Sequence, residues 1–121
     1  MPTYEWLLHK DKRILYMDIS HKDAEDLRNR IATLEPIVEK EPPQSILCLL
    51  NIEGGVISSE IAKILKDFAK HNEPYMKMSA VIGMEGLQHI IFKTVQMLTD
   101  RKNMVLKNSK QEALGWLSEQ E

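Results

Sequence analysis

The stretch Ile46-Leu47-Cys48-Leu49-Leu50-Asn51-Ile52-Glu53-Gly54-Gly55-Val56-Ile57-Ser58-Ser59-Glu60-Ile61 decides the fold. Its first part is continuously apolar, which is typical of a strand buried on both faces in a parallel sheet. A glycine pair follows, and two serines then precede the periodic apolar residues of a helix. This order of strand, tight loop and helix predicts an α/β protein.

The start of that helix is the first place to look for a chemical switch. Unpaired backbone N–H groups and a positive partial charge at a helix N-terminus favour phosphate, whether bound or covalent. Ser58 and Ser59 both lie there. Ser58 can also simply cap the helix, and the two roles do not exclude one another. We therefore expect a switch, if the chain has one, at Ser59 or Ser58.

Composition bounds the class of protein. The 121 residues form one domain over 1–121, long enough to bury a core without disulfides, and carry a net charge of −2 without blocks of like charge. Nucleic acid is therefore not expected as a partner. Cys48 is the single cysteine, which excludes an intrachain disulfide or a cysteine zinc site and predicts a buried apolar role. Neither a signal pattern nor a stretch suited to stable membrane insertion is recognisable, so a cytoplasmic protein is expected.

The N-terminal third predicts a hairpin and a helix. Strand-like runs cover 4–9 and 13–19, and the short connection over 10–12 requires a tight turn. Ser20, with Asp23 three residues later, predicts a capped helix whose apolar face continues to Leu34. Pro36 should kink or end this helix, and Pro42-Pro43 must stop it.

The C-terminal half continues the alternation of strands and helices. Apolar periodicity predicts a helix from Ser58, a strand over 75–82, a helix over 87–98, a strand over 103–107, and a last helix opened by the capping box at 109–112. In the last helix Ala113, Trp116 and Leu117 should face the core. The fold class is therefore α/β, a single-domain βα superhelix in the order β-β-α-β-α-β-α-β-α, with a mostly parallel sheet and an antiparallel N-terminal strand.

If successive strands are neighbours, every crossover helix lies on one side of the sheet. Two alternating sets should face these helices: Ile46, Cys48, Leu50 and Ile52, then Met76, Met78, Ala80 and Ile82. The opposite sets are too apolar to be left open: Ser45, Leu47, Leu49 and Asn51, then Tyr75, Lys77, Ser79 and Val81. A homodimer is the simplest cover. A bound apolar molecule or helices on both faces would serve as well.

The carboxyl ends of adjacent parallel strands share one sheet edge, where α/β proteins commonly bind ligands. The residues there predict a rim for a ligand or partner: Glu53, Gly54, Gly55, Glu60, Gly83, Met84 and Gly86. The glycines fit neither a Walker loop nor a dinucleotide fingerprint. His9, His21, His71 and His89 have no metal-ligand spacing and read as solvated surface, so neither a metal nor a cofactor is expected. Carboxylates on helix faces and the lack of a nucleophile elbow leave no catalytic residue to name and make an enzyme the weaker hypothesis.

Two local strings are similar to a known family. Residues 72–87, NEPYMKMSAVIGMEGL, resemble the Asn-x-Pro-Tyr-aliphatic-Lys, Ala-Val-aliphatic-Gly and Gly-Leu pattern of the SpoIIAA-like branch of STAS-type proteins, the fold of bacterial anti-sigma factor antagonists. The ending 112–117, EALGWL, is similar to that branch's Glu-Ala-x-x-Trp-Leu helix. The resemblance covers nearly the whole chain and implies a STAS-like βα superhelix, an architecture shared with CRAL-TRIO lipid-transfer domains.

The resemblance also suggests a function. In the antagonists, a partner anti-sigma kinase phosphorylates a serine in an Asp-Ser-Ser-Gly string at this helix start. The matching string here is Ile57-Ser58-Ser59-Glu60, with Ser59 at the modified position and with Ile57 and Glu60 replacing the flanking residues. We therefore expect a non-enzymatic regulatory module that binds a protein partner, such as a kinase-like or anti-sigma-like regulator. The alternative is a carrier of a small apolar or lipid-like ligand.

Overall fold

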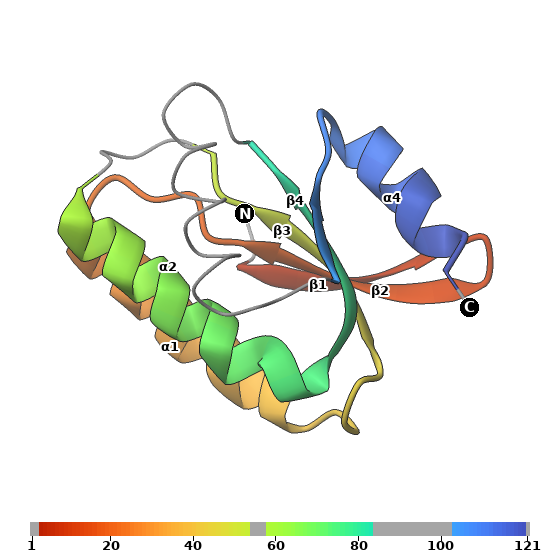
Figure 1. Cartoon of the computed structure of the whole chain (residues 1–121), viewed down its shortest axis with the longest axis horizontal. Helices are drawn as coiled ribbons and strands as arrows, with labels where there is room; N and C mark the ends of the chain where they lie inside the picture. Colours follow the sequence, from red (N-terminus) through yellow and green to blue (C-terminus); the bar gives the residue numbers. More distant parts are fainter. Residues whose placement is uncertain (1–2, 54–57, 84–102, 121) are drawn as a thin grey trace.

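The computed structural model describes residues 3–53, 58–83 and 103–120, and their strands form one mixed sheet. The strands are β1 (Tyr4–His9), β2 (Lys12–Asp18), β3 (Ile46–Asn51), β4 (Met76–Ile82) and β5 (Met104–Leu106). Their spatial order is β1-β2-β3-β4-β5; β1 and β2 are antiparallel and the other pairs are parallel (Figure 1). The predicted α/β class and the antiparallel N-terminal strand are confirmed.

The hairpin between β1 and β2 has a two-residue turn. His9 pairs with Lys12, and the two residues between them, Lys10 and Asp11, have φ angles of 50° and 66°. Positive φ at both central positions gives the turn whose twist matches that of the strands it joins. This turn fixes the register of the pair, so Trp6 lies opposite Leu15.

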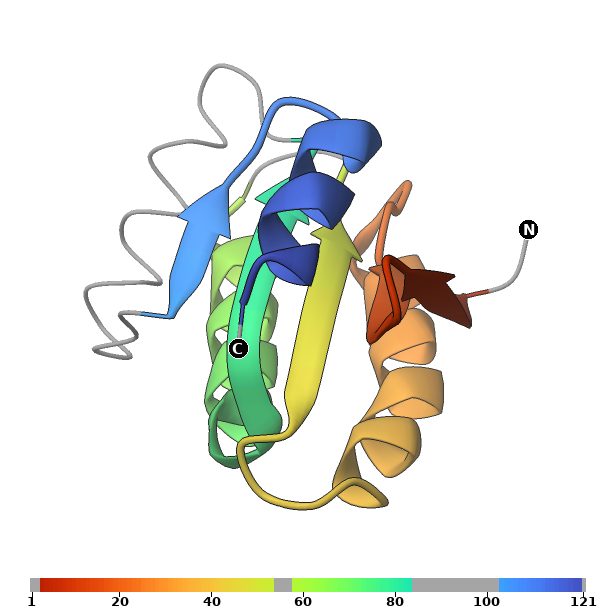
Figure 2. The same ribbon diagram turned by 90° about the vertical axis from the view of Figure 1, so that its right-hand side faces the viewer.

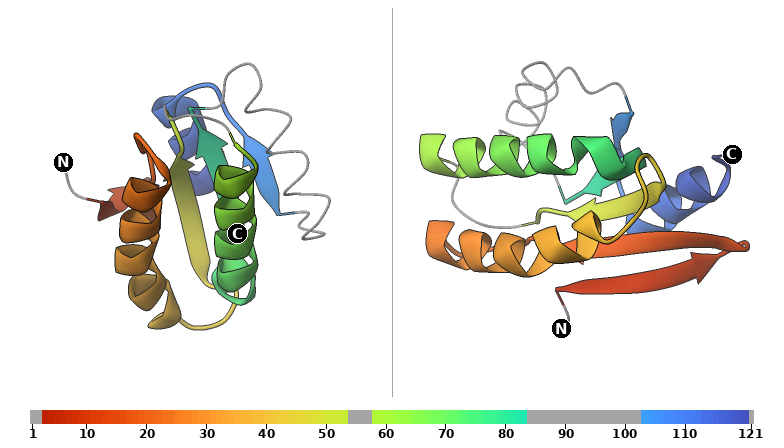
Figure 3. Two further views of the ribbon diagram at one scale, coloured as in Figure 1. Left: turned by 90° about the vertical axis from the view of Figure 1, so that its left-hand side faces the viewer. Right: turned by 90° about the horizontal axis from the view of Figure 1, so that it is seen from below.

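Helices α1 (Ala24–Glu39) and α2 (Ser59–Asn72) lie side by side on one face of the sheet (Figure 3). A short 3-10 helix, η1 (Glu73–Tyr75), leads from α2 into β4. The buried residues of the two helices are Leu27, Ile31, Leu34 and Val38 in α1, and Ile61, Phe68, Ala69 and Asn72 in α2. Both crossover helices therefore lie on the same side, as the strand order predicts.

Helix α1 differs from expectation at its cap and at Pro36. Asp23, not Ser20, caps the helix, since the Asp23 Oδ1 accepts a hydrogen bond from the Asp26 backbone N–H at 2.8 Å. Of the two effects expected of Pro36, a kink or an end, the end does not occur, because the helix continues through Pro36 to Glu39. Proline lacks the N–H that would bond to the carbonyl four residues earlier, so contacts with other elements must support the turn beyond it. Val38, fully buried in that turn, supplies one such contact.

Helix α4 (Lys110–Ser118) covers the other face of the sheet, in front of β3 and β4 in Figure 2. Ser109 caps it by accepting a hydrogen bond from the Glu112 N–H at 3.1 Å, as the capping box predicts. Its buried residues Ala113 and Leu117 belong to one cluster with Leu47 and Leu49.

Helix α4, which is not a crossover helix, therefore covers this second face within the chain. Helices on both faces are the outcome among the alternatives considered. A homodimer stays a prediction, but it no longer follows from exposure of Leu47 and Leu49, which are 6% and 0% exposed.

The register of β4 shifts by one residue at its start. Ile46 pairs with Met76, whereas the next residue of β3, Leu47, pairs with Met78, so Lys77 is an extra residue. Such a bulge reverses the faces of all later side chains.

The expected face sets of β4 are consequently wrong beyond Met76. Met78, Ala80 and Ile82 join the α4 cluster, whereas Val81 and the partly buried Tyr75 belong to the cluster under α1 and α2. The expected β3 set under those helices, Ile46, Cys48, Leu50 and Ile52, is confirmed.

The remaining expectations concern Cys48, membrane-spanning helices and the segment 87–98. Cys48 is buried, 2% exposed, as the sequence predicts. Within the described residues, none of the helices combines the length and apolar character needed to cross a membrane. The helix expected over 87–98 lies outside the described residues.

Candidate functional site

The first turn of α2 presents the two serines differently. Ser58 is the N-cap: its Oγ accepts a hydrogen bond from the Ile61 N–H at 3.1 Å, and its carbonyl accepts one from the Ala62 N–H at 3.0 Å. Ser59 is the first helical residue and is exposed, as is Glu60. Both serines are exposed, but Ser58 caps the helix, whereas Ser59 follows it as the first helical residue at the positive end of the helix.

A basic side chain of α1 lies beside this turn. The Arg28 guanidinium is 3.5 Å from Oε2 of Glu60, and the two side chains are 56% and 59% exposed. The ion pair links the N-terminal parts of α1 and α2 but contributes little to stability, because water screens it. Its location matters more than its strength. The negative charge of Glu60, in the first turn of α2, is offset by Arg28.

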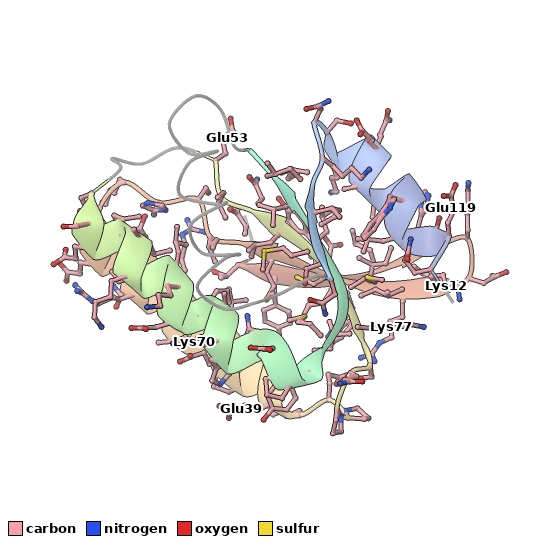
Figure 4. The ribbon with its side chains drawn as sticks, in the orientation of Figure 1. Lys12, Glu39, Glu53, Lys70, Lys77 and Glu119 are labelled. Atoms are coloured by element: carbon pink, nitrogen blue, oxygen red, sulfur yellow. The ribbon has the colours of Figure 1, made fainter. Side chains whose placement is uncertain are left out.

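The predicted rim is partly assembled at the ends of β3 and β4. Asn51 closes β3, and its Oδ1 accepts a hydrogen bond from the Glu53 N–H at 3.0 Å, while its Nδ2 donates to the Tyr16 hydroxyl at 3.2 Å. Gly83 passes so close to this turn that a β-carbon there would lie 2.7 Å from the Glu53 backbone nitrogen. Glu53 and Gly83 are therefore neighbours, and Figure 4 shows the Glu53 side chain at this edge of the sheet.

Of the other rim residues, Glu60 lies in the first turn of α2 and the rest are not placed. Gly54, Gly55, Met84 and Gly86 lie outside the described residues, as does Ile57. Their predicted role in holding a ligand or partner stays a prediction. Among the described residues, no group of three or more His, Cys, Asp or Glu side chains is arranged to hold a metal ion.

A polar cluster at the end of β2 was not anticipated from the sequence. The Asp18 carboxylate accepts a hydrogen bond from the Ser20 N–H at 2.9 Å, and an amino group of Arg30 donates to the Asp18 carbonyl at 3.2 Å. Nε of Arg30 is 3.6 Å from Oδ1 of Asp26. The cluster fixes the chain between β2 and α1. The only sequence signal for it is that Asp18 stands at the end of a strand, which does not identify the partner.

Two of the four histidines do not lie on a solvated surface, contrary to expectation. His21 is 8% exposed, with Nδ1 2.9 Å from the Ile19 carbonyl. His71 is partly buried between α2 and α1, with Nε2 2.7 Å from Oε1 of Glu39. His71 is placed by a tertiary contact with α1, whereas the bond of His21 is to the backbone two residues earlier, and metal-ligand spacing along the sequence signals neither. His89 lies outside the described residues.

The comparisons with known proteins bear on the fold. No protein-family model matches the chain, and no curated protein matches its sequence. A solved structure does resemble it: an uncharacterised protein of the DUF3478 family, with a SpoIIAA-like fold, from Shewanella loihica PV-4. The superposition has a TM-score of 0.70 at 20% sequence identity and covers 94% of this chain and 91% of the other. The five-stranded sheet with its helices therefore has a SpoIIAA-like fold, as the strings at 72–87 and 112–117 suggest.

Proposed function

We propose that this chain is a non-enzymatic, STAS-like regulatory module that binds a protein partner through the first turn of α2. The observation that carries the proposal is that only one of the two serines caps the helix. Ser58 caps the helix, so Ser59 is exposed beside Glu60 and Arg28 without a capping task. The SpoIIAA-like fold supports the proposal by analogy, because the chain resembles the STAS-type antagonists in fold.

Phosphorylation of Ser59 by a kinase-like partner is the switch that fits this turn. A phosphate on the first helical residue interacts favourably with the helix dipole, by about 0.3–1 kcal/mol for a surface charge. Arg28 offers a second favourable partner, since a guanidinium pairs readily with phosphate oxygens. In the unmodified chain Arg28 is 3.5 Å from Glu60. Phosphorylation would therefore redirect Arg28 and change the charge presented to the partner.

A partner-binding experiment tests the proposal. The tagged wild type and three variants, Ser59→Asp, Ser59→Ala and Gln111→Asp, are purified from the native host, and both phosphate and bound partners are measured by native mass spectrometry. Gln111 is the matched control, because it is exposed in the first turn of α4 and gains the same charge.

We expect phosphate on the wild type, its loss in Ser59→Ala, and a changed partner complex in Ser59→Asp alone. An unmodified wild type whose partners are identical in all variants would contradict the proposal. A bound mass of a small apolar molecule instead of a protein would favour the alternative, a carrier of a lipid-like ligand. The same spectra report whether the chain is a homodimer.

A further inference from the structure

The ring of His71 lies between the last turns of α1 and α2. Its Nε2 is 2.7 Å from Oε1 of Glu39 and its Nδ1 is 2.9 Å from Oδ1 of Asn72. Oε2 of Glu35 is 3.7 Å from Nδ1, and the Tyr75 ring lies at a centroid distance of 6.2 Å. Figure 4 places the labelled residues Glu39 and Lys70 at this end of the helix pair.

These contacts match a doubly protonated ring. A carboxylate can only accept hydrogen bonds, and the atom of Asn72 that meets the ring is also an acceptor. A neutral imidazole carries one N–H and can donate to only one side, whereas the imidazolium donates to both. Losing the proton therefore removes one of two hydrogen bonds and the attraction to two carboxylates.

The carboxylates of Glu35 and Glu39 lie before and after a missing hydrogen bond in α1. Glu35 and Glu39 are four residues apart and so share a helix face. Between them is Pro36, whose missing N–H leaves the Ala32 carbonyl without its helical partner. The turn beyond Pro36 is held by burial of Val38 and by the contacts of His71 with Glu35 and Glu39.

We propose that His71 is a proton-operated clamp: its imidazolium fastens the last turn of α1 to α2, and loss of the proton weakens the attachment of the residues after Pro36. The clamp acts at the opposite end of the helix pair from the Arg28–Glu60 ion pair. The proposal is independent of any role of Ser59.

The direction of the pH effect follows from the groups that face the ring. Burial disfavours the charged ring, but the hydrogen bonds with Asn72 and Glu39 and the charges of Glu35 and Glu39 outweigh it and raise the pKa of His71 above its ordinary value. Tyr75, from η1, also faces the ring. Because the pKa is raised on folding, the clamp is complete below the ordinary histidine pKa and is lost as the pH rises through the shifted one.

Amide hydrogen exchange measures the clamp directly. Protection at residues 37–40, corrected for the intrinsic rate, is compared at pH 6 and pH 8.5 in the wild type, His71→Gln and His9→Gln. Residues 27–31 of the same helix are the internal reference. His9 lies in β1 and is the matched control for loss of a histidine.

We expect protection at residues 37–40 of the wild type to fall roughly threefold between the two pH values, the size typical of a partly exposed ion pair. Protection in His9→Gln should fall in the same way, whereas protection of residues 37–40 in His71→Gln should be low at both pH values. The proposal would be overturned if the ratio of amide protection at residues 37–40 to that at residues 27–31 did not change with pH in the wild type. It would also be overturned if the pH effect persisted in His71→Gln.

Two further variants, Glu39→Gln and Pro36→Ala, test the proposal if His71→Gln proves unstable. In an NMR titration, Glu39→Gln should lower the pKa of the His71 ring while the chain stays folded. Pro36→Ala restores the missing N–H and should hold residues 37–40 in the helix at pH 8.5. A His71 ring that titrates at or below its ordinary pKa in the wild type, or is unaffected by Glu39→Gln, would overturn the clamp.

Discussion

Gly83 passes directly over Asn51: a β-carbon at Gly83 would lie 2.8 Å from Oδ1 of Asn51. The same oxygen accepts the hydrogen bond from the Glu53 N–H. The φ angle of Gly83 is 85°, a conformation that side chains disfavour. The end of β4 and the turn after β3 therefore depend on a residue without a side chain.

Gly83→Ala should be strongly destabilising for both reasons, the contact and the backbone conformation. We expect a loss of about 1–3 kcal/mol in the free energy of unfolding, measured by urea denaturation. Gly115→Ala is the control, because a β-carbon there meets no atom within 4 Å and the residue lies in α4. That variant should be unchanged or gain up to about 1 kcal/mol. Equal losses in the two variants would show that the close approach at Gly83 does not matter.

The two serines at the start of α2 should differ in stability. Ser58→Ala removes the acceptor of the Ile61 N–H and should cost about 1 kcal/mol. Ser59→Ala removes an exposed hydroxyl and should change the free energy of unfolding by less than about 0.5 kcal/mol. Thermal melts of both variants measure this. A larger loss for Ser59→Ala would mean that Ser59 has a structural role and would weaken its assignment to partner binding.

Coverage of the second sheet face can be tested with two leucines. Leu49 is fully buried beneath α4, whereas Leu8 of β1 is 76% exposed. Leu49→Ala should therefore cost about 2–5 kcal/mol in the isolated chain. Leu8→Ala should stay within about 0.5 kcal/mol of the wild type. The free energy of unfolding is measured at several protein concentrations whose oligomeric state is checked by sedimentation. If the loss caused by Leu49→Ala grew with concentration, a second copy and not α4 would bury Leu49.

Pro36 should lower the free energy of unfolding, although α1 continues through it. Pro36→Ala allows a hydrogen bond to the Ala32 carbonyl and should raise the free energy of unfolding by about 1–3 kcal/mol at pH 8.5. Pro42→Ala, in the loop after α1, should instead lose at most about 1 kcal/mol, because it only loosens the unfolded chain. A destabilised Pro36→Ala would show that the proline ring contributes packing that outweighs the missing N–H.

The sequence predicts the elements well where a pattern is local. Apolar periodicity gives α2, the serine and glutamate at 109–112 give the start of α4, and the short run over 10–12 gives the hairpin. The prediction fails where a distant contact decides the result. Pro36 is expected to kink or end α1, but the helix continues to Glu39, where Val38 is fully buried and Glu39 contacts His71 of α2.

The candidate site could be predicted only in part, for a similar reason. The role of Ser58 as a cap follows from the sequence, because capping is a local interaction. The pairing of Arg28 with Glu60, and that of His71 with Glu39, joins residues from different helices. No spacing along the chain shows such pairs before α1 and α2 are placed side by side.

The bulge at Lys77 makes the two parts of β4 non-interchangeable. Met76 belongs to the layer under α1 and α2, and Met78 to the layer under α4. Removing Lys77 would restore regular alternation and force one of these parts into the wrong layer. A chimera or design on this backbone must therefore keep all seven residues of β4, and a one-residue deletion here cannot be absorbed by shortening a neighbouring loop.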